Sequence, residues 1–471
     1  MEIASTNKID INKVLTDAYY DLAKNKKEIT DESAKQILSS IDRLKYIITK
    51  KTKINNVNGP VPSTKNNSKK RDQHGRTREY CYMCKTKIWC TDELHKSNKY
   101  LCKPCGTINF DRRNYKKDMN GKIAIVTGAR VKIGYETAIH LLRNGCYVIA
   151  TTRFVDDCLL RYKKNPDYCN FRNLLTIYQL DMLSFVSITN FEQFIYKNFD
   201  HIDYLINNAA QTIHRPKEFY EKLLDNLDNP ALKEYDVENK IFGRTNKIFM
   251  DSTSQKSITI SNEFNQKPEE FTGITFNELS KSQIQKTSDE QETKTEIKTS
   301  DLLTKYFPEG QLDEFGQQID LRPINTWILE MDQVHPYELA KVMLINTIAP
   351  YLLCSNLKKI MTKTDDYSWI VNVSSMEGCF NWSHKSSTHP HTNMAKASLN
   401  MMTRTCGKYF INSNIVMISV DTGWNNSQYP NSYNTITPLD CVDGAARILW
   451  PIYSESKRHS VLYKDYEVRN W

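Results

Sequence analysis

Residues 121–153 read GKIAIVTGARVKIGYETAIHLLRNGCYVIATTR and decide the fold. A short β-branched run at 123–127 is broken by Gly128, and apolar residues at helical spacing follow over 133–142. A second apolar run occupies 147–150. This order predicts a strand, a glycine turn, a helix and a second strand, which together form a βαβ unit. A nucleotide phosphate would bind at the turn, because the N–H groups at a helix N-terminus are unpaired and carry a partial positive charge.

The glycine turn reads TGARVKIG over residues 127–134. It resembles the T-G-x-x-x-G-x-G fingerprint of the short-chain dehydrogenase/reductase superfamily, with a lysine at the place of the middle glycine. The resemblance implies that a nicotinamide dinucleotide binds against this turn. The residues that would contact it here are Gly128, Arg130, Lys132, Ile133 and Gly134.

Further landmarks follow in the order that the superfamily shows. After the next predicted strand, Asp181 and Met182 stand where the superfamily contacts the adenine ring. The sequence NNAA, with Asn208 and Ala209 at its centre, matches N-N-A-G, and such small residues imply that the sheet edge approaches the cofactor ribose. Gly423 lies in DTGW, where Pro-Gly is usual, and keeps the tight turn under the nicotinamide.

These landmarks predict an α/β fold, a doubly wound and mainly parallel Rossmann sheet with helices on both faces. The domain is expected over 119–471, and the resemblance covers about 119–225 and 334–471 of it. Residues 225–305 are rich in Asn, Ser, Thr, Lys and Glu, and most of this segment is predicted to be a disordered insertion. Residues 307–331 are predicted to be ordered.

The resemblance also implies a catalytic group. Asn346 would support a water chain, Ser375 would hydrogen-bond the substrate carbonyl and Lys396 would hydrogen-bond the nicotinamide ribose. The tyrosine expected four residues before the lysine is replaced by Thr392. A tyrosine has a reference pKa of about 10 that a nearby ammonium can lower, whereas a threonine hydroxyl does not readily ionise. The proton-transfer part of the site is therefore altered.

Three replacements for the missing tyrosine stay open. His389 or His391 could supply the proton, since histidine titrates near neutral pH. Tyr429 could reach the site from another loop. Ser375 and Thr392 could hold a water relay. The competing interpretation of the two histidines is that they are ordinary loop residues.

The choice of cofactor depends on the end of the second strand. Arg153 stands there, and a basic residue at this place suits the 2′-phosphate of NADP(H), whereas an acidic residue suits the ribose hydroxyl of NAD(H). Arg130 and Lys132 add positive charge at the same corner. The sequence therefore favours NADP(H) over NAD(H), with ordinary surface cations as the alternative.

A cysteine-rich segment at 79–113 precedes this domain. It holds two C-x-x-C pairs separated by seventeen residues, a spacing typical of a structural zinc site closed by four thiolates. Cys90 and His95 lie between the pairs and are predicted not to be ligands. The predicted zinc ligands are Cys81, Cys84, Cys102 and Cys105.

The N-terminal part is predicted to be a helical pair at 1–50 and a flexible basic linker at 51–78. The net charge of +9 is mild, and the linker is interpreted as solvated, so nucleic-acid binding through Arg71, Arg76 and Arg78 is disfavoured. No apolar run is long enough for a membrane span, and no signal peptide is recognised. The scattered cysteines suit reduced thiols, which favours a cytoplasmic protein and leaves the nucleus open.

The sequence thus predicts an NADP(H)-dependent oxidoreductase that transfers hydride between nicotinamide and a small carbonyl compound or secondary alcohol. The alternative is a catalytically impaired, cofactor-binding scaffold or sensor that uses the zinc module for protein interaction. A protein partner would bind through the zinc module or the N-terminal helices. The resemblance also leaves a homo-oligomer open, since family members commonly pair through helices of the sheet domain.

Overall fold

The computed structural model describes most of the chain after the predicted linker. The predicted helical pair at 1–50 and the linker at 51–78 lie outside the described residues, as do Cys90 and most of the insertion predicted at 225–305. The described residues are 80–88, 93–220, 223, 240–243, 305–364, 366–381, 385–431 and 435–471.

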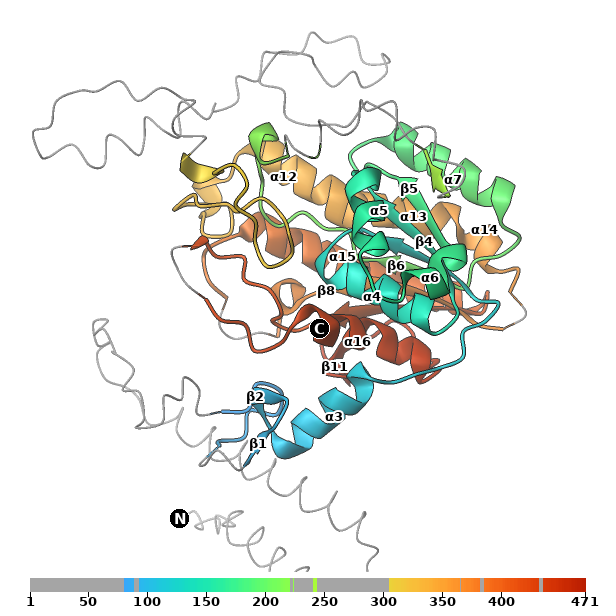
Figure 1. The fold of residues 1–471 in the computed structure, drawn as a ribbon. Coiled ribbons are helices and arrows are strands. Elements are labelled where there is room, and N and C mark those ends of the chain that lie inside the picture. Colours follow the sequence, from blue (N-terminus) through green and yellow to red (C-terminus); the bar gives the residue numbers. More distant parts are fainter. Residues whose placement is uncertain are drawn as a thin grey trace, which may run out of the picture. The chain divides into compact units, whose positions relative to one another are not determined.

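A nine-stranded sheet forms the centre of the described structure (Figure 1). Its order is β11-β10-β9-β8-β6-β3-β4-β5-β7, and every neighbouring pair is parallel except β10 and β11. This mainly parallel arrangement confirms the predicted fold class. The strands are β3 (Ile123–Thr127), β4 (Tyr147–Thr152), β5 (Leu175–Gln179), β6 (Tyr204–Asn207), β7 (Ile241–Phe242), β8 (Ser368–Ser374), β9 (Ile415–Asp421), β10 (Leu462–Lys464) and β11 (Glu467–Arg469).

Side chains of the central strands alternate between two apolar cores, one on each face of the sheet. In β3, Ala124 and Val126 join one core while Ile125 joins the other. Strands that are covered on both faces read as continuous apolar runs, which is why the sequence showed no polar alternation there.

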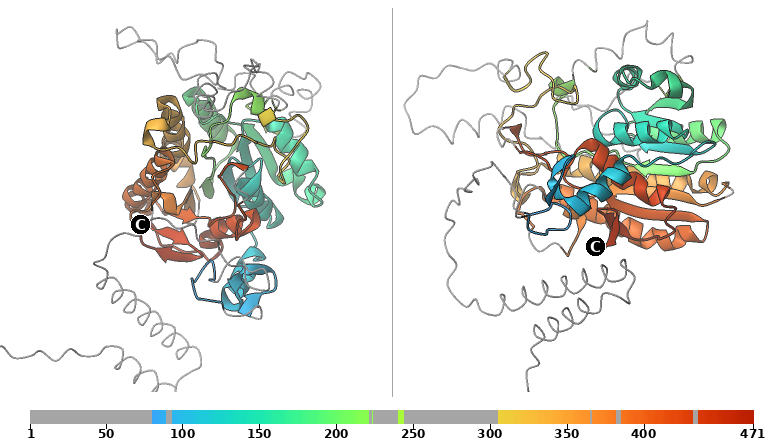
Figure 2. Two further views of the ribbon diagram at one scale, coloured as in Figure 1. Left: turned by 90° about the vertical axis from the view of Figure 1, so that its left-hand side faces the viewer. Right: turned by 60° about the horizontal axis from the view of Figure 1, so that its bottom comes forward.

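Helices cover both faces (Figures 1 and 2). Among the described residues, no helix combines the length and the apolar character needed to cross a membrane. One core includes residues of α4 (Lys132–Arg143), α5 (Val155–Lys163), α6 (Tyr168–Phe171) and α16 (Cys441–Tyr453). The other core includes residues of α7 (Phe185–Asn198), α13 (Ala349–Asn356), α14 (Lys358–Met361) and α15 (Pro390–Ile411), and α12 (Pro336–Met343) precedes α13 in the chain.

One short strand differs from the sequence-based expectation. Residues 241–242, inside the segment predicted to be a disordered insertion, form β7 and pair with β5 at the edge of the sheet. The physical reason is apolar burial: Ile241 is 4% exposed and joins the core beneath α5. An isolated apolar pair between polar stretches was too short to indicate a strand.

The cysteine module packs against the C-terminal part of the sheet domain. It consists of β1 (Leu94–His95), β2 (Asn98–Cys102) and α3 (Lys103–Arg113), and α3 contacts α16. Both views of Figure 2 show the blue module beside the red C-terminal elements. The module has only a small apolar core, centred on Cys81, Ile88 and Leu101.

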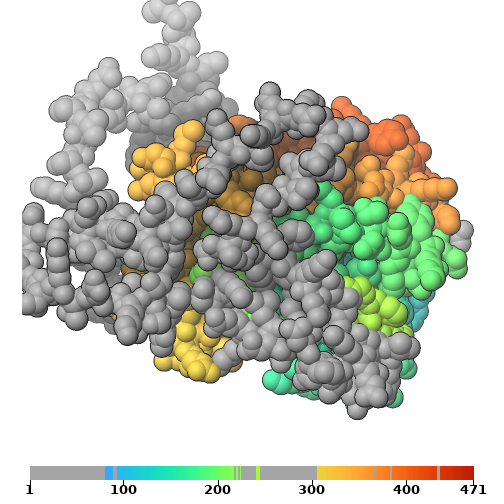
Figure 3. Space-filling view, turned by 90° about the horizontal axis from the view of Figure 1, so that it is seen from above, coloured from blue at the N-terminus to red at the C-terminus, as the bar shows by residue number. Residues whose placement is uncertain are grey.

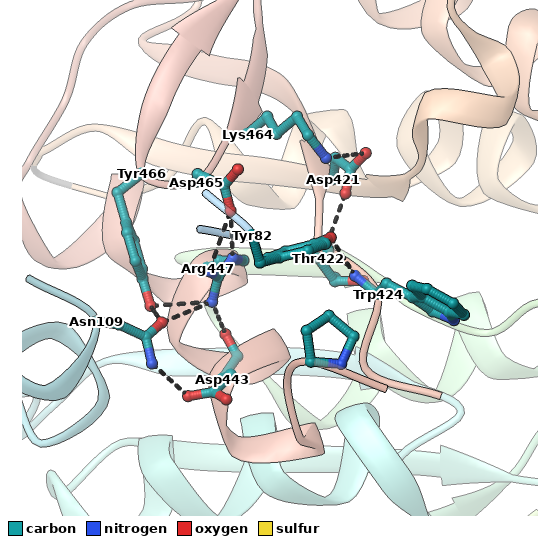
Figure 4. Close-up of polar contacts among 12 residues, drawn as sticks. Tyr82, Asn109, Asp421, Thr422, Trp424, Asp443, Arg447, Lys464, Asp465 and Tyr466 are labelled. Atoms are coloured by element: carbon teal, nitrogen blue, oxygen red, sulfur yellow. Dashed lines mark hydrogen bonds and ion pairs between the residues drawn. The ribbon is translucent and has the colours of Figure 1, made fainter. Parts of the chain in front are cut away.

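A buried arginine joins the two parts (Figure 4). Arg447 of α16 is 1% exposed, and its guanidinium donates to Asp465 Oδ1 at 3.1 Å and to Asn109 Oδ1 of α3 at 2.9 Å. Tyr466 also donates to Asn109 Oδ1, at 2.8 Å. A buried charge is tolerated only when paired and hydrogen-bonded in this way.

Replacing Arg447 by methionine is expected to destabilise the fold strongly, because Asp465 would keep a buried charge without its partner. The expected loss in free energy of unfolding is about 3–5 kcal/mol, measured by urea denaturation. The control is Arg143→Met, which removes a surface ion pair with Asp167 whose side chains are 46% and 41% exposed. That change is expected to cost about 0–1 kcal/mol. Equal losses in the two variants would contradict the assignment.

Candidate functional site

The glycine turn brings the ends of β3 and β6 into close contact. Gly128 has a φ of 68°, and a Cβ on Gly134 would lie 2.3 Å from Gly128 O and 2.4 Å from Asn208 Nδ2. Asn208 Nδ2 donates to Thr127 O at 2.9 Å, while Thr127 Oγ1 accepts from the backbone N–H of Ala209 at 2.9 Å. The turn therefore requires glycine at both positions and leaves the N-terminus of α4 beside the sheet edge, as the sequence predicted.

The three basic residues predicted to lie near the cofactor phosphate, Arg130, Lys132 and Arg153, differ in their partners. Arg130 is 7% exposed and pairs with Asp157 Oδ2 at 2.5 Å; burial lowers the pKa of Arg130, and Asp157 opposes that effect. Arg153 lies over the rings of Phe154 and Tyr220, at 5.3 and 5.2 Å, and no carboxylate of the described residues pairs with it. Arg153 thus has no carboxylate partner among the described residues, whereas Arg130 shares Asp157 with Arg161.

Lys132 takes the place of the middle glycine at the cost of a left-handed backbone, with a φ of 57°. Its Nζ lies 4.9 Å from the ring centroid of Phe315, and burial lowers its pKa. Arg161 donates to Gly316 O at 2.8 Å. Both cations therefore contact residues 305–331, which we call the crossing segment.

The residues predicted to lie near the adenine ring and the nicotinamide are all in tight turns. Asp181 is 5% exposed, and its Oδ1 accepts from Leu183 N at 3.0 Å, which holds the turn before α7. Met182 is 7% exposed and belongs to the core. Gly423 has a φ of 79°, and its N–H donates to Asp421 Oδ1 at 2.6 Å.

Lys396 is the buried cation of the predicted catalytic group. It lies on α15, is 8% exposed, and its Nζ donates to Val373 O of β8 at 2.7 Å. Burial lowers its pKa to about 8, against the opposing charges of Glu377 and Asp421. A buried ammonium with one described acceptor can make further hydrogen bonds to a ribose.

Asn346 is held in a π-helical stretch, Leu344–Ile348 (η6), between α12 and α13. Such stretches are frequent at functional sites. Its side-chain amide donates to Gln211 O at 2.9 Å and accepts from Gln211 N at 2.7 Å. Asn346 therefore fixes the loop after β6, and this partner was not predicted because it lies 135 residues away in the chain.

Ser375 and Thr392 belong to two segments of the chain that pack together at Lys396. Ser375 follows β8 and begins the short turn Met376–Gly378 (η7), where a Cβ on Gly378 would lie 2.5 Å from the Lys396 carbonyl carbon. Thr392 is one helical turn before Lys396 on α15, so both side chains share a face. Its hydroxyl is buried and has no hydrogen-bond partner among the described residues. The structure thus brings together the predicted serine, threonine and lysine elements.

The two histidines lie in different environments. His389 stacks on Trp327 with ring centroids 3.9 Å apart, its Nδ1 lies 2.8 Å from Trp327 O, and burial lowers its pKa. His391 is 1% exposed, and its Nε2 lies 3.6 Å from Glu338 Oε1 of α12. Both ring nitrogens of His391 have no hydrogen-bond partner among the described residues. His389 therefore anchors the crossing segment, and His391 is buried against Glu338.

The crossing segment forms hydrogen bonds with the loop after β6 and with the loop after β9. Thr326 Oγ1 accepts from His214 N at 3.2 Å, and Asn325 Nδ2 donates to Gln428 O at 3.0 Å. Tyr429 lies edge-on to Trp327 at 6.4 Å. Part of the segment is visible in yellow on the face shown in Figure 3. The sequence indicated order here through Trp327 and two glycines, but these partners could not be predicted.

The four predicted metal ligands converge in the cysteine module. Their sulfur atoms all lie within 4.8 Å of one another, and the sulfur atoms of Cys84 and Cys102 are 3.7 Å apart. None of the four forms a disulfide. His95, predicted not to be a ligand, uses its Nδ1 to accept from Ser97 N at 3.2 Å and does not belong to the cluster. Four thiols at this separation fit a tetrahedral metal ion.

Comparison with known proteins agrees with this geometry. A family model described as short chain dehydrogenase matches residues 122–229. An uncharacterized protein of Acanthamoeba polyphaga mimivirus is 26% identical over 82% of this chain and 74% of its own length. The WW domain-containing oxidoreductase of Drosophila melanogaster is 35% identical, over 20% of this chain and 23% of its own.

Retinol dehydrogenase 13 of Mus musculus is 35% identical over 20% of this chain and 28% of its own length, so this chain aligns with well under two thirds of it and of the fly protein. A solved NADPH-bound carbonyl reductase from chicken fatty liver shares 15% identity and has a TM-score of 0.44, covering 75% of this chain and all of its own. The glycine turn, the landmarks in order and the family match over residues 122–229 support a member of the short-chain dehydrogenase/reductase superfamily.

The lowered pKa of Lys396 predicts a specific pH dependence of stability. The native pKa of about 8 lies below the reference value of 10.5, so the unfolded chain binds more protons between these pH values. The contribution of Lys396 to stability is therefore expected to rise with pH from 8 to 10.5, by at most about 1.4 kcal/mol per pH unit.

The measurement is urea unfolding of the wild type and Lys396→Met between pH 7 and pH 10. The difference in free energy of unfolding is expected to shift in favour of the wild type above pH 8. Lys359→Met, which removes an exposed lysine of α14, is the control. A difference between wild type and Lys396→Met that stays constant with pH would contradict a buried, titrating lysine.

Proposed function

We propose that the protein is an NADP(H)-dependent oxidoreductase acting on a carbonyl compound or the corresponding secondary alcohol. The observation that carries the cofactor choice is Arg153, which lies at the end of β4 over two aromatic rings without a described carboxylate partner. Gly128 and Gly134 leave no room for a Cβ at the turn where the pyrophosphate would bind. Lys396 would hold the nicotinamide ribose.

The chemistry divides between two groups of residues. NADPH, when bound, supplies the hydride that adds to the carbonyl carbon. Ser375 would polarise the carbonyl oxygen, and Asn346 keeps the loop after β6 in place through Gln211. The oxygen also needs a proton. Thr392 can donate a hydrogen bond but does not readily ionise, so the proton would come through water held by Ser375 and Thr392, or from His391.

A second candidate function is a cofactor-binding scaffold or sensor that has lost catalysis. The observation that favours it is Thr392 itself, whose buried hydroxyl has no described partner in the place of an acidic tyrosine. Both candidates need an intact nucleotide site. They differ in whether bound NADPH is consumed.

Under either candidate function, the cysteine module would bind a structural zinc ion. Its four thiols fit a closed tetrahedral site without a position for catalytic water. The contacts of α3 with α16 favour docking onto the sheet domain over nucleic-acid binding. The scattered cysteines of the sequence favour a cytoplasmic protein and leave the nucleus open.

Cofactor titration tests the proposed function. The purified protein is expected to bind NADPH more tightly than NADH, measured by the fluorescence of the reduced nicotinamide. Arg153→Asp is expected to weaken NADPH binding at least tenfold, because a carboxylate would repel the 2′-phosphate. NADH binding should change less, which serves as the internal control.

Each result has a defined meaning. Failure to bind either nucleotide would refute the oxidoreductase. Binding followed by oxidation of NADPH in a screen of aldehydes and ketones would establish the enzyme. Binding without turnover, together with turnover by Thr392→Tyr, would establish the scaffold instead.

Metal analysis tests the cysteine module. We expect one zinc ion per chain by mass spectrometry, and we expect Cys84→Ser to lose the ion and to lower the melting temperature, because metal binding supplies much of the folding energy of a small module. Cys169→Ser, which changes an exposed cysteine outside the cluster, is the control. Full zinc content in Cys84→Ser would contradict the assignment of this ligand.

A further inference from the structure

The cysteine module contacts the loop that would lie under the nicotinamide. Tyr82 lies between the ligands Cys81 and Cys84, and its hydroxyl accepts a hydrogen bond from the backbone N–H of Trp424 at 2.7 Å (Figure 4). A Cβ on Gly423 would lie 3.3 Å from the same hydroxyl. One side chain of the module thus reaches the turn that follows β9, 342 residues away in the chain.

The turn is also held from the sheet. Gly423 N–H donates to Asp421 Oδ1 at 2.6 Å, and Lys464 Nζ of β10 pairs with Asp421 Oδ2 at 3.1 Å. Tyr82 supplies the support on the opposite, module side. Its ring is attached to the first C-x-x-C turn, so its position depends on how that turn is folded.

The same turn adjoins the cofactor turn. A Cβ on Gly444 of α16 would lie 2.5 Å from Asn425 Nδ2 and 3.2 Å from Ile133 Cγ1. Asn425 Nδ2 in turn donates to Thr422 O at 3.1 Å. The loop after β9 and the glycine turn after β3 therefore converge on one point at the start of α16.

The cysteine module also contacts the C-terminal end of the loop that follows β9. Asn98 Nδ2 of β2 donates to Pro438 O at 3.0 Å, and Asn109 Nδ2 of α3 donates to Asp443 Oδ1 at 2.7 Å. Arg113 pairs with Asp443 at 2.8 Å. Contacts at Trp424 and at Pro438 fix the two ends of one loop to one small module.

We propose that Tyr82 is a positioning residue for the nicotinamide side of the site, and that zinc loading of the cysteine module thereby sets the affinity for NADPH. This inference rests on the proposed function. Without the metal, the first C-x-x-C turn would lose the constraint that places Tyr82, and the Trp424 N–H would lose its acceptor. The loop would then sample open conformations, and binding would have to order it again.

The test uses the full chain with Tyr82→Phe, which removes only the accepting oxygen. The control is Tyr80→Phe, a change in the same module at a tyrosine that is 51% exposed. Hydrogen exchange of a peptide containing the Trp424 amide measures the loop directly, and NADPH fluorescence measures affinity. Loss of one hydrogen bond is expected to raise both the exchange rate and the NADPH Kd by about twofold to tenfold. Tyr80→Phe is expected to change neither.

The second part of the experiment removes zinc with a chelator. In the wild type it is expected to reproduce the faster exchange and the weaker binding, whereas in Tyr82→Phe it should add little, because the contact is already lost. Peptides of β3 and β6 should keep their protection, which would show that the sheet domain stays folded.

The outcomes separate the two proposals. Unchanged exchange at Trp424 in zinc-free wild type or in Tyr82→Phe would overturn the positioning role. Faster exchange with unchanged NADPH affinity would overturn the link to the cofactor. If the wild type binds no NADPH, the proposed function fails and the link to affinity fails with it, while the exchange data still decide whether the module holds the loop.

Discussion

The close approach of β3 and β6 at their carboxyl ends is the constraint on which the cofactor side of the site depends. Thr127 accepts backbone N–H groups from the start of the next loop, and Asn208 returns a hydrogen bond to Thr127 O. Only glycine at 134 leaves room for this exchange. The N-terminus of α4 is consequently directed at the sheet edge, where Arg153 directly follows β4.

The role open to each basic residue of the site depends on its burial and its partners as well as on its residue type. Arg130 and Arg153 look alike in the sequence, and both lie over the ring of Phe154, yet of the two only Arg130 pairs with a carboxylate of the described residues, that of Asp157. A guanidinium over aromatic faces keeps its charge and its donors available. Lys396 is buried without a carboxylate contact among the described residues, which explains the direction of its lowered pKa. The structure therefore distinguishes a cation that maintains the fold from cations that could serve a ligand.

Much of the fold and of the cofactor turn followed from the sequence, because these parts depend on local patterns. Apolar runs, glycines and the NNAA turn lie within a few residues of the contacts that they specify. The four cysteines were predicted for the same reason, since the ligand spacing is itself the signal.

What the sequence missed depends on contacts between distant segments: Asn346 with Gln211, His389 with Trp327, Tyr82 with Trp424, and Ile241 at the sheet edge. No periodicity encodes which two loops will meet.

The position of Thr392, where the superfamily has a tyrosine, is fixed by the backbone and not by its side chain. The lysine and the threonine share a face of α15, whose backbone is fixed by η7 and by β8, so the position survives whichever side chain occupies it. Under the proposed function, the side chain itself would contribute only proton transfer. The crossing segment stacks on the start of α15 through Trp327 and His389, and the buried side chains of His391 and Glu338 lie 3.6 Å apart. Under the proposed function, binding and proton transfer would use different residues, so the nucleotide site could be preserved while the acid is exchanged, lost or supplied by a neighbour. The cysteine module contacts the loop of Gly423 and Trp424, and it also contacts Pro438 and α16.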